Sequence, residues 1–180
     1  ASNADGFVFR VDMRLRPYGD SGPLVASLAM LENYFFTQAR AWERYAWAKA
    51  RAVTGANHDL AALASLVRPF VFRRYLDFVA LENLRDMHRQ VREEVKRRDR
   101  ENDIKLGPGG IREIEFIAQV FQLIRGGRDT SLQTRATIAT LQLLAEKSLL
   151  PAGTVAELLD AYRFLRALEH RLQYRDDAQT

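Results

Sequence analysis

One short segment of this sequence alternates like a β-strand, and most of the remaining chain repeats with the period of an α-helix. From Phe7 to Leu15 the apolar side chains occupy every second position, and Pro17, which cannot donate to a sheet, ends the pattern. A lone strand leaves backbone N–H and C=O groups unpaired. We therefore expect this strand to pair with a sheet outside the segment, with another stretch such as 48–53, or with a second copy of the chain.

The spacing of apolar residues after the strand predicts six or seven helices and a mainly α, bundle-like fold. Ser27 is a suitable cap for the first of them, and Gly126 is placed to end a strongly apolar one. The expected ranges are 28–35, 42–49, Asn57 or Asp59 to Val67 with Pro69 breaking the pattern, Asp77–Arg98 as the longest helix, 111–126, 134–147 and 152–174.

Composition limits the classes of function that this chain can have. Hydrophobic residues make up 47% and charged residues 28%, which is typical of a globular protein, and no apolar run approaches the roughly 20 residues that a membrane span needs. The absence of cysteine excludes disulfides and thiolate metal sites and fits a cytoplasmic protein. A net charge of +4 is weak support for nucleic-acid binding, whereas the excess of arginine over lysine suits an acidic or phosphate-bearing ligand.

Asp12 is the first candidate for chemistry. It lies on the polar face of the predicted strand, where a carboxylate can hold Mg²⁺ if other acidic groups converge on it. The alternative is a surface ion pair with Arg10 or Arg14, and the strand pattern alone favours this alternative.

Two further segments are candidates for binding an anion. Arg14 and Arg16, followed by the small residues of 19–22, are suited to cradling a phosphate, and an ordinary strand end with a surface turn is an equal alternative. The second segment contains Lys105, Gly109 and Gly110 directly before a helix, whose first N–H groups can bind an anion.

The second segment also has a structural interpretation. It lacks the Gly-Lys-Ser/Thr ending of a P-loop, and Glu113 is placed to bond back to the start of the helix as part of a tight turn. On the residues alone this interpretation is somewhat favoured. Trp42 and Tyr45 have the spacing of core residues, and the three histidines have no metal-site spacing.

Several long segments resemble those of bacterial glutamine synthetase adenylyltransferases. They are Arg10–Val25, Trp42–Arg51, Arg68–Phe78, Asp103–Ile117 and Gln119–Gly127, and the similarity runs nearly from Asp5 to Thr180. The motifs at 19–24, 69–75 and 105–110 look like the N-terminal, deadenylylating half of that family. A related glycine turn occurs in PII uridylyltransferases, so that motif is less specific.

The resemblance implies an enzyme with two nucleotidyltransferase-like halves that control nitrogen assimilation. One half attaches AMP to a tyrosine of glutamine synthetase, and the other removes it by phosphorolysis and releases ADP. Mg²⁺, ATP, ADP and inorganic phosphate would be its ligands, and the PII signal protein and the effector glutamine its regulators. Asp12 would be the third carboxylate of the metal site, and Arg14, Arg16, Lys105, Gly109 and Gly110 would bind nucleotide or phosphate.

The resemblance also divides the chain. Residues 1–4 look like the remnant of a cleaved tag, 5–26 like the end of a nucleotidyltransferase domain with the strand left from its sheet, and 27–180 like a helical domain. The family's Asp-x-Asp pair is absent, so we expect no phosphorolysis by this segment alone. The alternatives are a helical module that docks glutamine synthetase or PII, and a PII uridylyltransferase-like enzyme. Neither a membrane nor nucleic acid is expected as a partner.

Overall fold

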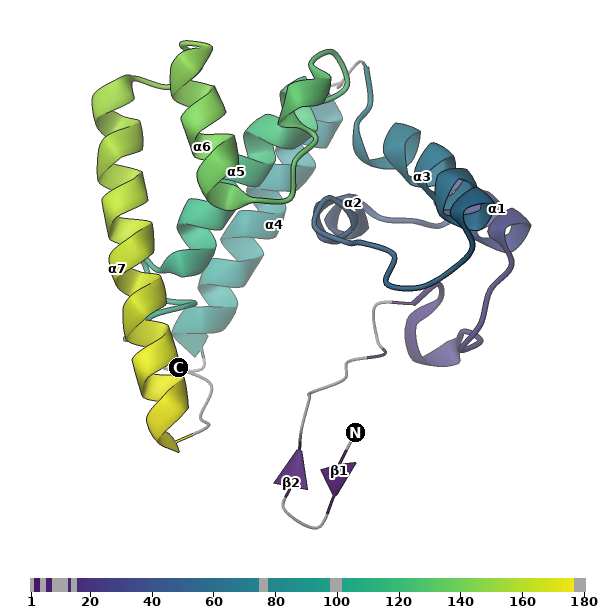
Figure 1. Cartoon of the computed structure of the whole chain (residues 1–180), viewed down its shortest axis with the longest axis horizontal. Helices are drawn as coiled ribbons and strands as arrows, with labels where there is room; N and C mark the ends of the chain where they lie inside the picture. Colours follow the sequence, from purple (N-terminus) through teal and green to yellow (C-terminus); the bar gives the residue numbers. More distant parts are fainter. Residues whose placement is uncertain are drawn as a thin grey trace.

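The chain is mainly helical, as its sequence predicts. A computed structural model describes residues 2–3, 6–7, 13, 16–74, 78–97 and 102–176. Its helices are α1 (Leu28–Thr37), α2 (Ala41–Trp47), α3 (Asn57–Val71), α4 (Phe78–Arg97), α5 (Ile111–Arg125), α6 (Thr137–Glu146) and α7 (Ala152–Asp176), with short 3₁₀ helices at Gly19–Ser21 and Thr130–Leu132 (Figure 1). None of the helices in the described part is long and apolar enough to cross a membrane.

The β structure that is described consists of two very short strands. β1 (Ser2–Asn3) and β2 (Gly6–Phe7) pair antiparallel, with Ser2 opposite Phe7. Most of the strand predicted from Phe7 to Leu15 lies outside the described residues, so its pairing beyond Phe7 stays a prediction. The proposed boundary between 5–26 and 27–180 also stays a prediction.

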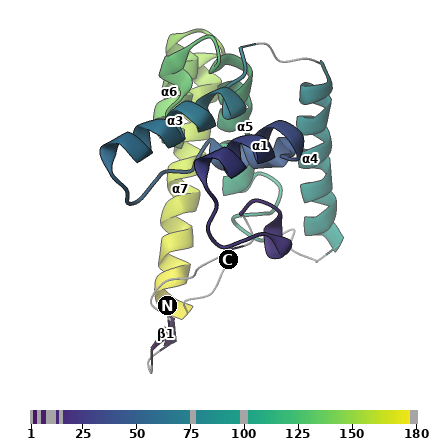
Figure 2. The same ribbon diagram turned by 90° about the vertical axis from the view of Figure 1, so that its right-hand side faces the viewer.

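The helices surround two apolar clusters that share α5. In the first cluster, buried residues of α1 and α3 and Ala48, just after α2, pack with Leu123 of α5, and the rings of Phe35 and Phe70 stack at 4.0 Å. The second cluster joins α5, α6 and α7 around Ala118, Leu141 and Leu144. Figure 1 shows α1 and α3 on one side, α6 and α7 on the other, and α2 and α5 between them. In Figure 2, α1 and α3 lie crosswise to α4 and α7.

Local signals placed several helix ends correctly. Ser27 caps α1, because its hydroxyl accepts a hydrogen bond from the N–H of Met30 at 3.2 Å. α5 ends at Gly126 and α3 begins at Asn57, both as predicted. Within the described residues α4 has 20 residues and α7 has 25, while the predicted ends of α4 at Asp77 and Arg98 lie outside them.

The prediction that Pro69 ends α3 is wrong, because the helix continues to Val71. A proline removes one N–H donor and crowds the preceding turn, which normally stops a helix. Here tertiary contacts compensate at the C-terminal end. The buried guanidinium of Arg44 donates to the carbonyl oxygens of Phe70 and Val71, each at 2.9 Å, and so satisfies acceptors that a helix end leaves unpaired.

Gln122 forms a polar contact in the centre of the molecule. Its side chain is fully buried, and its Nε2 donates to the carbonyl oxygens of Leu132 (2.9 Å) and Thr134 and to the hydroxyl of Thr140 (3.0 Å). These bonds tie the segment between α5 and α6 to α5. The bonds to Leu132 and Thr140 are buried, so these two acceptors depend on the amide of Gln122.

We expect Gln122→Met to lower the free energy of unfolding by about 2 kcal/mol, since it leaves buried acceptors unpaired while keeping side-chain length. Urea denaturation measures the loss. Gln142→Met is the matched control, because Gln142 is exposed on α6 and the change there should stay within about 0.5 kcal/mol. Equal effects at the two positions would contradict the role given to the buried amide.

Candidate functional site

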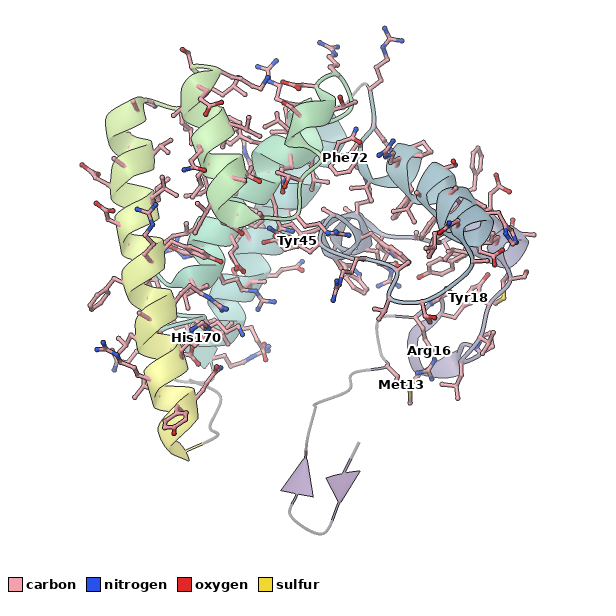
Figure 3. The ribbon with its side chains drawn as sticks, in the orientation of Figure 1. Met13, Arg16, Tyr18, Tyr45, Phe72 and His170 are labelled. Atoms are coloured by element: carbon pink, nitrogen blue, oxygen red, sulfur yellow. The ribbon has the colours of Figure 1, made fainter. Side chains whose placement is uncertain are left out.

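A pocket of about 570 Å³ lies where α2, α4, α5 and α7 meet the glycine-rich segment before α5. We call it the glycine-turn pocket. Figure 3 shows Tyr45, one of its lining residues, between α2 and α5. Its lining residues are Trp42, Tyr45, Ala46, Lys49, His88, Val91, Arg92, Asp103, Lys105, Leu106, Arg112, Glu113, Glu115, Phe116, Gln119 and Gln173.

The glycine turn is built by hydrogen bonds within the chain. The carboxylate of Asp103 accepts from the N–H groups of Lys105 and Leu106, both at 2.9 Å. Gly110 is the N-cap of α5 and lies so close to neighbouring backbone that a Cβ there would stand 2.7 Å from the oxygen of Ile104. Any larger residue would therefore force the turn to shift.

The first N–H groups of α5 are already used by the turn. Ile111 donates to the carbonyl of Ile104 at 3.1 Å, Arg112 donates to that of Lys105 at 3.0 Å, and the N–H of Gly109 donates to Glu113 Oε2 at 2.9 Å. The bond from Gly109 confirms the tight turn in which Glu113 reaches back. A helix N-terminus binds an anion through N–H groups that are free. In this structure, an anion in the pocket would therefore be bound by side chains and not by the backbone N–H groups of the turn.

Three cations line the pocket near the turn, and two of them pair with carboxylates. The Nζ of Lys105 lies 3.3 Å from Oε1 of Glu169, which is only 1% exposed and also pairs with Arg166 on α7. Arg92 Nε lies 3.5 Å from Glu113 Oε1. A buried carboxylate needs such partners, so Glu169 fixes Lys105 at the edge of the pocket. Arg112 is exposed and makes no hydrogen bond or ion pair with its side chain to any described residue.

The polar wall on α5 changes the acidity of two tyrosines. Burial, and then the negative charge of Glu115, raise the pKa of the Tyr45 hydroxyl well above its usual value, while Arg112 acts in the opposite direction. Burial and Glu115 also raise the pKa of Tyr162, whose hydroxyl donates to Glu115 Oε1 at 2.9 Å. Burial lowers the pKa of Lys49, and Glu115 opposes that shift.

Arg16 is not brought to this pocket. Its guanidinium donates to the carbonyl oxygens of Met13 (2.7 Å), Gly22 (3.1 Å) and Asp20 (3.2 Å), and so organises its own loop. Figure 3 shows Arg16 far from His170, which is on α7 and adjoins Glu169. The structure therefore does not bring Arg16, from the first candidate anion-binding segment, into the pocket formed by the second. Asp12 and Arg14 lie outside the described residues, so their predicted roles in binding metal and phosphate stay predictions.

The described residues contain no group of three or more His, Asp or Glu side chains that could hold a metal ion. The structure also adds residues that the sequence did not single out. His88 Nε2 lies 3.6 Å from Glu113 Oε1, and the exposed Arg92 of α4 also lines the pocket. Trp42, expected in the core, is 40% exposed.

Comparison with known proteins identifies the family. The model described as Glutamate-ammonia ligase adenylyltransferase matches residues 1–65, and the model described as GlnD PII-uridylyltransferase matches residues 85–180. Relatives named bifunctional glutamine synthetase adenylyltransferase/adenylyl-removing enzyme align across both segments. That from Chromobacterium violaceum is 66% identical over 179 residues, and that from Aromatoleum aromaticum is 66% identical over 175.

This chain is therefore similar over nearly its whole length to bifunctional enzymes of that name, at 66% identity to each of the two. More than half of it, residues 85–180, also belongs to the domain family described as GlnD PII-uridylyltransferase. The two relatives are covered over 20% and 18% of their length, while 99% and 97% of this chain is aligned. A third relative, from Nitrosomonas eutropha, is 64% identical over 98% of this chain and 19% of its own length. The chain therefore spans about a fifth of the family members that it matches.

We expect Gly110→Ala to lower the free energy of unfolding by about 1–3 kcal/mol, because its methyl group would press on the backbone oxygens of Ile104 and Gly107. Urea denaturation measures this change. Gly153→Ala is the control, since a Cβ there meets nothing within 4 Å, and it should stabilise α7 by up to about 1 kcal/mol. A loss of stability at Gly110 with a gain at Gly153 would support the close approach of backbone to Gly110. Equal gains in stability at the two positions would contradict it.

We also expect Tyr45 to ionise at a higher pH than an exposed tyrosine does. With its pKa raised in the folded state, Tyr45 keeps a proton that the unfolded chain releases near its usual value of 10.0. The resulting stabilisation is complete below that pH and is lost as pH rises above it. In a pH titration followed by tyrosinate absorbance, Tyr45→Phe should lack one group that ionises at high pH. Tyr174→Phe is the control, because Tyr174 is 95% exposed and its replacement should leave the Tyr45 signal unchanged.

Proposed function

We propose that this chain is part of the adenylyl-removing half of a bifunctional glutamine synthetase adenylyltransferase/adenylyl-removing enzyme. The observation that carries the proposal is 66% identity over 99% of the chain to a relative of that name. The reaction is phosphorolysis of the bond between AMP and a tyrosine of glutamine synthetase. An oxygen of inorganic phosphate attacks the AMP phosphorus, the tyrosine oxygen leaves and takes up a proton, and ADP is released.

In this proposal the glycine-turn pocket binds the phosphate-bearing reactants through side chains. Lys105 is held in place by the buried Glu169, and Arg112 is exposed at the start of α5 with no side-chain partner among the described residues. Both line the pocket. Such cations lower the barrier by positioning a phosphate and neutralising its charge. Gly109 and Gly110 support them by shaping the turn, since the N–H groups there already have partners within the chain.

The remaining assignments of the longer enzyme rest on the resemblance. They are Asp12 as a ligand of Mg²⁺, Arg14 and Arg16 as phosphate contacts, ATP as the nucleotide of the adenylylating half, PII and glutamine as regulators, and a cytoplasmic location. For Arg16, phosphate binding would require its guanidinium to give up the loop carbonyls that it now contacts. The alternatives of a docking module and a uridylyltransferase-like enzyme are not favoured by the relatives.

The test is ADP release from adenylylated glutamine synthetase and phosphate by the longer enzyme that carries this segment. We expect Lys105→Ala to reduce kcat/KM for phosphate roughly 10- to 100-fold, as loss of a charge-assisted contact implies. Lys147→Ala is the matched control, because Lys147 pairs with Asp129 and does not line the pocket. We expect Asp12→Ala to abolish the activity and Asp20→Ala, at an exposed loop position, to preserve it.

These variants separate the parts of the proposal. Full activity of Lys105→Ala would reject the glycine-turn pocket as the phosphate site, and full activity of Asp12→Ala would reject the metal role. Failure of the unmodified longer enzyme to release ADP from adenylylated glutamine synthetase would reject the proposed reaction itself.

A further inference from the structure

A second groove lies next to the end of α2 and shares no lining residue with the glycine-turn pocket. It has a volume of about 400 Å³ and is formed by the segment after α2, by α3 and by residues 133–135 before α6. We call it the arginine groove. Its lining residues are Trp47, Ala48, Ala50, Arg51, Ala52, Leu60, Leu63, Ala64, Val67, Arg68, Phe72, Gln133, Thr134 and Arg135.

The floor of the groove is apolar and partly covered. Trp47, Leu63, Val67 and Phe72 are partly buried side chains that pack against the first apolar cluster while also lining the groove. They therefore offer a fixed apolar surface to a ligand. Val53, in the segment that continues after Arg51 and Ala52, is 83% exposed. An accessible apolar floor of this kind favours a ligand that carries an apolar side chain.

The rim of the groove is strongly positive. Arg51, Arg68 and Arg135 are all exposed, and none of their guanidinium groups makes a hydrogen bond or ion pair with a residue in the part of the chain that the structure describes. The lining contains no aspartate or glutamate. This differs from the glycine-turn pocket, where Glu113, Glu115 and Asp103 accompany the cations. The three arginines are thus available for carboxylates of a ligand.

The walls of the groove are held together before any ligand binds. The Nζ of Lys49, just after α2, donates to the carbonyl of Arg135 at 2.7 Å and to the hydroxyl of Thr137 at 3.0 Å. At the other end, α5 packs so closely on Phe72 that a Cβ on Gly126 would stand 2.7 Å from the ring; Figure 3 shows Phe72 there, between α3 and the end of α5. A pre-formed groove spends little binding energy on ordering its own walls.

Energetics favour a peptide over a small anion. An exposed ion pair contributes little binding energy, so three exposed arginines would hold an isolated anion weakly. A ligand that adds burial of an apolar side chain to several carboxylate contacts gains much more. We propose that the arginine groove binds an acidic peptide segment, with an apolar side chain on the Trp47–Phe72 floor and carboxylates at the arginines. This site is separate from the proposed phosphorolysis and does not depend on it.

The test uses this 180-residue chain and a fluorescein-labelled peptide of alternating glutamate and leucine. We expect saturable binding by fluorescence anisotropy that weakens as salt rises. The triple variant Arg51→Ala, Arg68→Ala and Arg135→Ala should bind about tenfold more weakly. The matched control replaces Arg163 and Arg171, exposed on α7, and Arg125, at the end of α5, with alanine and should bind like the unmodified chain.

Trp47 provides a second measurement that reports the place of binding. The chain has two tryptophans, so Trp42→Phe leaves Trp47 as the sole tryptophan reporter. Peptide binding should then change Trp47 emission, and leucine-to-glycine replacement in the peptide should remove that change. Equal affinity in the two triple variants, or binding that leaves Trp47 unchanged, would overturn the proposal. The proposal would also be overturned if inorganic phosphate displaced the labelled peptide as effectively as unlabelled peptide does, because the groove would then be a simple anion site.

Discussion

The structure depends on how α5 is fixed at its two ends, because α5 is the helix that both apolar clusters share. At its start, Gly110 allows carbonyl oxygens of the turn to approach and accept from the first N–H groups. At its end, Gly126 allows the Phe72 ring to lie against the backbone. Between these ends the buried amide of Gln122 holds the segment that leads to α6. The glycine-turn pocket and the arginine groove are both bounded by parts that α5 positions.

Charge is distributed differently in the two grooves. In the glycine-turn pocket, carboxylates hold the cations in place: Glu169 fixes Lys105 and Glu113 pairs with Arg92. Such pairing gives defined positions, which suit a site that must orient a phosphate for chemistry. In the arginine groove no carboxylate lines the surface, so its guanidinium groups are not committed to partners in the described chain. That arrangement suits recognition of an acidic ligand.

The sequence predicted the helices well where the signal is local. Ser27 and Gly126 mark helix ends because capping depends on a few adjacent residues, and the return of Glu113 to the turn results from its position in the first turn of α5. The prediction failed at Pro69, where Arg44, far earlier in the chain, satisfies the end of α3. The ion pair of Arg92 with Glu113 could not be read from the sequence, because helical periodicity does not show which neighbour an exposed side chain will meet.

The sequence by itself determined the mainly helical fold, the glycine turn before α5 and the family resemblance, since apolar spacing, backbone freedom at glycine and long ordered motifs are all readable along the chain. Only the tertiary structure decided which charged groups meet. In the folded chain Lys105 lies beside the buried Glu169, and Arg16 binds carbonyl oxygens of its own loop. Three arginines surround the apolar floor of the arginine groove. Contacts of this kind join residues far apart in sequence, and they form only when the helices pack.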